Sequence, residues 1–232
     1  MPFSDVNDRV TEIRGLIADA VRRGGHGQDV RIIAVTKTHG PEAVEAATRA
    51  GIVDVGENKV QEALDKQDAL AATKALSREA RWHLIGHLQR NKAKFLDRFA
   101  MLHALDSSRL ADAVHEFGVR RGRAVDALLQ VNVAGEETKG GFAPSDVRAE
   151  ADRMRAMSGV RLMGVMTMAP FDAGERVLRE VFACARAARD VLVAAGHQAH
   201  ELSMGMSGDY AIAVEEGATM VRLGTVLFGA RT

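Results

Sequence analysis

The chain has 232 residues, of which 31 are basic and 31 acidic, and it contains one cysteine. A chain of this length can bury one large hydrophobic core, and its balanced charge argues against nucleic acid as the main partner. A single cysteine excludes an internal disulfide and is typical of a reducing compartment. The sequence starts without a basic region followed by a long apolar one, and no apolar stretch reaches membrane-spanning length. We therefore expect a cytoplasmic protein that binds neither nucleic acid nor membranes.

Short β-branched segments alternate with longer amphipathic ones along most of the chain. Ahead of them, apolar residues recur at helical spacing and predict an extra N-terminal helix: Val6, Val10, Ile13, Ile17 and Val21. Strands are predicted at residues 31–36, 52–56, 81–85, 101–104, 124–132, 160–166, 199–203 and 219–223. Helices are predicted at residues 42–50, 59–76, 88–99, 108–117, 145–157, 175–195 and 209–216, and only a short tail follows the last strand. This alternation predicts an α/β fold, a single (β/α)8 TIM-type barrel, with residues 1–232 as one domain.

Lys37 follows the first predicted strand and is flanked by two threonines. A lysine at a strand end usually extends into water, so the position alone favours a solvated amine. Barrels of this class nevertheless carry their sites at the carboxyl ends of the strands, and an amine there can condense with an aldehyde. Lys37 is therefore a candidate for forming a Schiff base.

Two segments rich in glycine and hydroxyl side chains follow the predicted seventh and eighth strands. They are residues 203–209 (SMGMSGD) and 222–225 (RLGT). Glycine and serine also make ordinary turns, but loops at these two places commonly bind phosphate in such barrels. The residues predicted to surround the anion are Ser203, Gly205, Ser207, Gly208, Arg222, Gly224 and Thr225. An amine and a phosphate site at one barrel end together predict pyridoxal 5'-phosphate, although Arg222 could face the ring nitrogen instead of the phosphate.

Other polar side chains follow their strands at the same predicted rim. Asn58 and His87 could contact the ring, but they could equally cap a helix and end a turn. His83 and His87 have the spacing of metal ligands on a helix, yet here the residues between them belong to a strand end. Since no acidic or cysteine ligand is spaced to complete a coordination shell, we expect no metal site.

Several blocks of the sequence resemble, in one order, the YggS/PROSC group of pyridoxal phosphate homeostasis proteins, which is related to the amino-terminal barrel of alanine racemase. They include AVTK at 34–37, GENKVQE at 56–62, WHLIGHLQ at 82–89 and GVMT at 164–167, together with the two glycine-rich segments. The resemblance implies that Lys37 forms the Schiff base. It also implies that Ser203, Ser207, Arg222, Gly224 and Thr225 hold the phosphate and that Asn58, His87 and Met166 surround the cofactor. Members of the group bind the cofactor and help to regulate its supply, without an established reaction.

Two classes of function stay open at this point. The leading one is a non-catalytic carrier that holds pyridoxal 5'-phosphate and passes it to apo-enzymes, as a monomer or weak dimer. The alternative is a weak amino-acid racemase or a Schiff-base aldolase, but a racemase needs a second base, which related enzymes take from an additional domain. Lys139, in a glycine-bounded loop, could accept the aldehyde during transfer, although an ordinary solvated lysine is the simpler interpretation.

Overall fold

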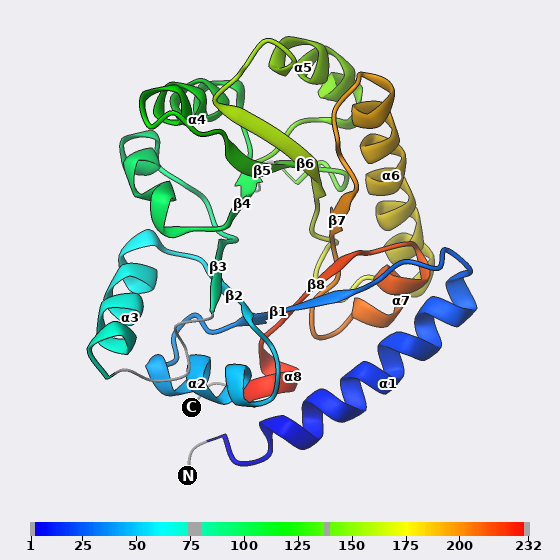
Figure 1. Ribbon diagram of the computed structural model, residues 1–232. Coiled ribbons are helices and arrows are strands. Elements are labelled where there is room, and N and C mark those ends of the chain that lie inside the picture. The colour runs from blue at the N-terminus through cyan, green and yellow to red at the C-terminus, as the bar shows by residue number, and fades with distance from the viewer. Residues whose placement is uncertain (1–2, 74–79, 137–139, 230–232) are drawn as a thin grey trace.

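Eight parallel strands close into a barrel in the computed structural model, which describes residues 3–73, 80–136 and 140–229. The strands pair in chain order, and β1 closes the ring against β8, with Ile33 opposite Arg222. Their bounds are β1 Arg31–Val35, β2 Asp54–Glu57, β3 Arg81–Leu84, β4 Met101–Leu105, β5 Val125–Gln130, β6 Val160–Met166, β7 Glu201–Ser203 and β8 Met220–Leu223. Figure 1 shows this ring with the helices outside it. The predicted (β/α)8 barrel is confirmed.

The helices cover the outside of the barrel and match the predicted pattern, with two differences. Their bounds are α1 Val6–Gly24, α2 Pro41–Arg49, α3 Val60–Thr73, η2 Arg90–Arg98, α4 Ser108–Arg120, η3 Pro144–Asp146, α5 Val147–Met154, α6 Glu175–Ala194, α7 Tyr210–Glu215 and α8 Thr225–Phe228. The last part of the helix predicted at 59–76 lies outside the described residues. Within the described residues, no helix is long and apolar enough to cross a membrane.

The first difference is η2, which is a 3₁₀-helix where an α-helix is predicted. Its buried residues Ala93 and Leu96 are followed by buried Phe99, and this spacing of three is the repeat of a 3₁₀-helix. The second is α8, which forms where only a short tail is predicted. The amide groups of Leu227 and Phe228 both donate to the Gly224 carbonyl at 2.9 Å, and both side chains are buried, so this segment is anchored to the barrel.

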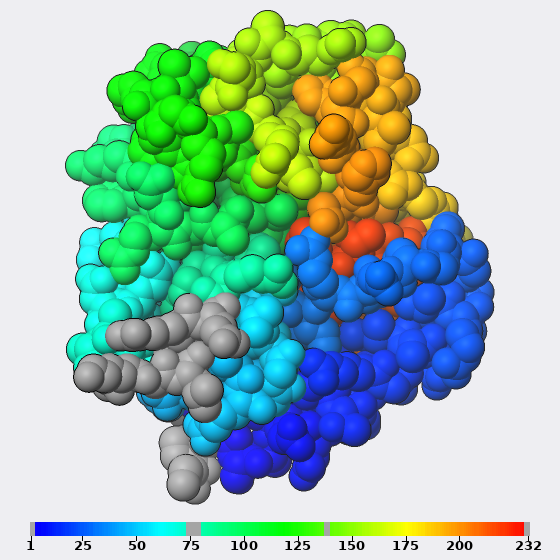
Figure 2. Space-filling view, viewed as in Figure 1, coloured from blue at the N-terminus to red at the C-terminus, as the bar shows by residue number. Residues whose placement is uncertain are grey.

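Apolar side chains fill two regions of the molecule. The larger lies between the strands and the surrounding helices and includes the buried face of α1, which packs against α2, α7 and α8. The smaller lies inside the barrel and consists of Ile33, Met101, Ala104, Leu128, Met166 and Met220. Figure 2 shows side chains covering the middle of the ring in the same view. The barrel is therefore a packed support for its loops, not an open channel.

Candidate functional site

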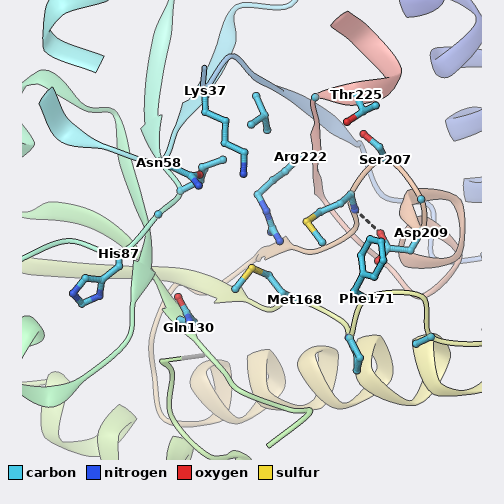
Figure 3. Close-up of a pocket in the computed structure, with 18 of the residues that line it drawn as sticks. Lys37, Asn58, His87, Gln130, Met168, Phe171, Ser207, Asp209, Arg222 and Thr225 are labelled. Atoms are coloured by element: carbon cyan, nitrogen blue, oxygen red, sulfur yellow. Dashed lines mark hydrogen bonds between the residues drawn. The ribbon is translucent and has the colours of Figure 1, made fainter. Parts of the chain in front are cut away.

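A cavity of about 1210 Å³ opens at the carboxyl ends of the strands. Residues at or just beyond the ends of all eight strands line it, and Figure 3 shows their side chains. They include Lys37, Asn58, His87, Asp106, Gln130, Met168, Ser207, Gly208, Arg222, Gly224 and Thr225. The structure thus brings the two glycine-rich segments and the strand-end lysine to one place, as predicted.

Lys37 lies two residues beyond β1, and its half-buried side chain points into the cavity. Both of its neighbours are held by side chains from β2 and α3. The Thr36 hydroxyl donates to Glu57 Oε1 at 2.5 Å, and the Thr38 amide donates to Glu62 Oε1 at 2.6 Å. Thr38 has a φ of 69°, a left-handed conformation that β-branched residues rarely adopt. These contacts therefore hold a strained turn beside the lysine.

Lys66 on α3 joins these contacts into one cluster, the Lys66 clamp, which consists of Lys66, Glu57 and Glu62. Its ammonium group donates to Glu57 Oε1 at 2.6 Å, to Glu62 Oε1 at 2.8 Å and to the Thr36 carbonyl at 2.8 Å. The Glu57 side chain is completely buried and that of Lys66 is 7% exposed. Burial raises the pKa of Glu57, although hydrogen bonds from Lys66 and Thr36 act in the opposite direction. The clamp is a buried ion pair under the lysine-bearing turn.

The loops after β7 and β8 converge on one side of the cavity. The Ser207 hydroxyl accepts a hydrogen bond from the Val226 amide at 3.4 Å, next to Thr225. Asp209 Oδ1 accepts from the Met206 amide at 2.5 Å and so folds the first loop back on itself, and burial raises the pKa of this carboxyl. Figure 3 shows the Ser207 and Thr225 side chains together on this side. Two hydroxyl groups and the glycines beside them form a small polar pocket, as an anion requires.

Arg222 is buried below these loops, and it borders the cavity from β8. Its Nη1 donates to the Ser203 carbonyl and to the Ser203 hydroxyl, both at 2.7 Å, and its Nη2 donates to the Thr167 carbonyl at 2.9 Å. Burial lowers the pKa of Arg222 to about 10, so it stays charged at neutral pH. The guanidinium is thus held at the floor of the cavity, away from the Ser207 and Thr225 hydroxyls (Figure 3).

Three residues predicted near the cofactor, Ser203, Gly205 and Met166, are not among those that line the cavity. Ser203 is completely buried beneath Arg222, and Met166 is 1% exposed in the cluster inside the barrel. Both belong to strands, and their side chains point into the barrel interior. Met168, two residues further along, reaches the cavity in place of Met166.

The remaining rim carries polar side chains, only some of which were predicted. His87 is exposed, and its Nδ1 lies 2.6 Å from Asp106 Oδ2. Gln130 donates to the carbonyl of Gly140, which also lines the cavity, while Lys139 lies outside the described residues. Asp106 and Gln130 were not predicted, although Asp106 directly follows β4 and Gln130 ends β5, which is the kind of position that identified Asn58. Among the described residues, no group of three or more His, Cys, Asp or Glu side chains could hold a metal ion.

Comparison with known proteins agrees with this geometry. The family model for the alanine racemase N-terminal domain matches residues 18–232. A pyridoxal phosphate homeostasis protein of Aquifex aeolicus is 38% identical over 231 residues, which cover 97% of each chain. Another, from Pseudomonas aeruginosa, is 37% identical over 99% of this chain and 97% of its own. The chain belongs to the pyridoxal phosphate homeostasis protein family. The family resemblance inferred from the sequence blocks is confirmed.

A solved structure extends the family comparison to three dimensions. PipY from Synechococcus elongatus, in a structure with PLP bound, is 35% identical to this chain and superposes with a TM-score of 0.84. The match covers 97% of this chain and 100% of PipY. This chain and PipY therefore share the barrel over almost their whole lengths.

Proposed function

We propose that this protein binds pyridoxal 5'-phosphate as a Schiff base with Lys37 and takes part in the supply of that cofactor. The observation that carries the proposal is that one cavity holds both the Lys37 amine and the hydroxyl pair of Ser207 and Thr225. The names of the relatives and the cofactor in PipY support the same ligand.

The residues around the cavity fit the groups of this cofactor. Ser207, Thr225 and the glycines beside them, Gly208 and Gly224, offer hydroxyl and backbone donors to the phosphate. We assign Arg222 to the ring and not to the phosphate, because its bonds to Ser203 and Thr167 hold it at the cavity floor. Asn58 and His87 stand on the rim where they can contact the ring. When bound, the cofactor supplies an aldehyde carbon with which a primary amine condenses, releasing one water molecule.

We further propose that the role is cytoplasmic, non-catalytic storage and delivery to apo-enzymes. A racemase needs two bases on opposite faces of its substrate. The only tyrosine of the sequence, Tyr210, is buried in the core outside the barrel and does not line the cavity. A cavity that opens at the strand ends suits an aldehyde that must be handed over more than a carbanion that must be kept from water.

The test is borohydride reduction of the purified protein after addition of the cofactor, followed by peptide mapping. Lys37 should carry the label, and Lys37→Ala should lose the visible absorption band while remaining folded. Lys59→Ala is the matched control, because Lys59 is an exposed lysine beside the same rim. Label on another lysine of the unaltered protein would contradict the assignment.

Delivery needs its own measurement. Cofactor-loaded protein mixed with an apo-transaminase should restore transaminase activity faster than spontaneous release of the cofactor can. Recovery no faster than that release would contradict the carrier role, and turnover of amino acids by the loaded protein alone would favour the racemase.

A further inference from the structure

A chain of hydrogen-bonded polar side chains crosses the inside of the barrel and ends at Arg222. Arg222 Nη1 donates to Ser203 Oγ at 2.7 Å, and this oxygen lies 2.9 Å from His103 Nδ1. His103 Nε2 lies 2.9 Å from His83 Nδ1, and His83 Nε2 lies 2.8 Å from Asp54 Oδ1. We call Asp54, His83, His103 and Ser203 the buried polar chain.

The buried polar chain connects the two ends of the barrel. His103 is on β4 and Ser203 on β7, strands that are not neighbours, so their hydrogen bond crosses the interior. At the far end, Asp54 Oδ2 accepts from Arg81 at 2.6 Å, and the Arg81 side chain is 53% exposed. Asp54 also lines a second cavity, of about 620 Å³, next to α1. The polar chain therefore runs from this end of the barrel to the floor of the Lys37 cavity.

When both imidazoles are neutral, the groups at its two ends fix the direction of every hydrogen bond along the buried polar chain. A guanidinium can only donate, so Ser203 Oγ accepts from Arg222 and turns its own hydrogen towards His103 Nδ1. His103 then donates from Nε2 to His83, and His83 donates from Nε2 to the Asp54 carboxylate. Burial is the main cause that holds the pKa of His103 well below its ordinary value, and the charge of Arg222 acts in the same direction, which keeps this imidazole neutral. Burial alone would raise the pKa of Asp54, but hydrogen bonds from His83 and Arg81 lower it. Asp54 is therefore an ionised carboxylate that accepts the last hydrogen bond of the buried polar chain.

Arg222 is oriented by these partners. A guanidinium has five N–H groups, and three of those of Arg222 are taken by Ser203 and Thr167. Among the described residues, the other two N–H groups have no hydrogen-bond partner, and the residue borders the cavity. Fixing three donors on the inner side leaves the other two for a ligand.

We propose that His83 and His103 are positioning residues for the cofactor, although neither lines the cavity. They hold the Ser203 hydroxyl in the orientation that accepts from Arg222, and Arg222 then presents its two remaining donors to the ring. The inference rests on the proposed cofactor, since it assigns a role to Arg222 beneath the ring. A fully satisfied buried network rigidifies its surroundings, whereas a broken one leaves unpaired polar atoms. This explains why two imidazoles stand in a barrel interior that apolar side chains otherwise fill.

The first arm of the test needs no cofactor. Nitrogen NMR of histidine-labelled protein should show both buried imidazoles protonated on Nε2, with Nδ1 as the acceptor. Ser203→Ala should move the His103 Nδ1 resonance towards that of a free acceptor. Protonation of Nδ1 on either ring of the unaltered protein would overturn the direction of the chain.

The second arm measures cofactor affinity and the position of the visible band. His103→Leu should weaken binding roughly tenfold, because it removes the acceptor that orients Ser203 under a charged group. His103→Asn should stay within about threefold of the unaltered protein, because its amide oxygen can accept in place of Nδ1. Met101→Leu, an apolar change in the barrel interior on the same strand, is the control and should change affinity by less than about twofold.

The outcomes separate this inference from the proposed function. If the unaltered protein does not bind the cofactor, the proposed function fails, and the inference fails with it whatever the NMR arm reports. If it binds and His103→Leu binds equally well with an unchanged band, the inference fails and the function stands. Should His103→Leu not fold, Ser203→Ala replaces it, with the same tenfold loss expected from roughly the same lost bond.

Discussion

Replacement of Lys66 by methionine tests the buried ion pair under the lysine-bearing turn. The methionine keeps most of the length of the side chain but removes three hydrogen bonds, to the Thr36 carbonyl, Glu57 and Glu62. Glu62 is 27% exposed and can be rehydrated. Glu57 is completely buried, and its Oε2 already has no partner among the described residues, so its carboxylate would keep only the Thr36 hydroxyl. The lost stability therefore comes mainly from the carboxylate of Glu57.

Removing one partner of a buried ion pair costs about 3–5 kcal/mol, and we expect Lys66→Met to lower the free energy of unfolding by that amount. For a chain of this size, this lowers the midpoint of thermal unfolding by roughly 10 °C. The assay is urea unfolding of the cofactor-free protein at pH 7, followed by circular dichroism. Lys94→Met, on an exposed side chain, is the matched control and should change stability by less than about 0.5 kcal/mol.

A double variant checks the cause. Lys66→Met combined with Glu57→Gln removes the buried charge together with its partner, and it should recover at least about half of the loss. A loss below about 1 kcal/mol in Lys66→Met would refute the reasoning, because a buried carboxylate without its cation cannot be that stable. So would a double variant as unstable as the sum of the two single ones.

Three further predictions concern the cavity and the polar chain. The folded protein keeps His103 neutral, so the unfolded chain binds one more proton below pH about 6.5. The free energy of unfolding should therefore fall by up to about 1.4 kcal/mol per pH unit as the pH drops from there. Urea unfolding from pH 7.5 to 5.5 should show a shallower dependence of this free energy on pH for His103→Asn, and equal dependences would contradict this. Thr225→Val should weaken cofactor binding by about 1–3 kcal/mol while Thr225→Ser retains it, measured by titration, and equal binding of pyridoxal lacking the phosphate would contradict the anion site. Gly205→Ala should destabilise the loop after β7, because Gly205 has a φ of 91° and an added Cβ would lie 2.6 Å from the Ala213 side chain; an unchanged thermal midpoint would count against this strain.

The fold could be predicted because each strand and helix carries its own local pattern. The strands are short segments set between longer amphipathic ones, and α1 and α6 show long apolar stripes. Prediction failed where the apolar pattern of a helix is too short or does not have the period of an α-helix. α8 has four residues, less than needed to show helical periodicity, and η2 repeats every three residues.

The sequence could predict which loops form the candidate site, but it could not predict which side chains reach the cavity and which are buried below it. Residues after strand ends, such as Lys37, Asn58 and Thr225, reach the cavity because parallel strands all end on one face. Ser203 and Met166 also lie near strand ends, but the alternation of strand side chains turns them inward. No local pattern reveals a hydrogen bond between His103 and Ser203, which are far apart in the sequence. The Schiff base, the single domain and the oligomeric state stay predictions.

The closure of the barrel by β1 and β8 also bears on how the protein is made. The Lys37 turn follows the first strand, whereas Arg222 and Thr225 are contributed by the last strand and the helix after it. A chain growing on a ribosome thus carries Lys37 long before it carries the residues that we assign to the phosphate. Up to Ser203, the nascent chain has the lysine but neither glycine-rich loop, and the register of β1 with β8 is unsatisfied. Binding of the proposed cofactor by both ends of the cavity must therefore wait until β8 has been made, so that it cannot guide the folding of the first strands.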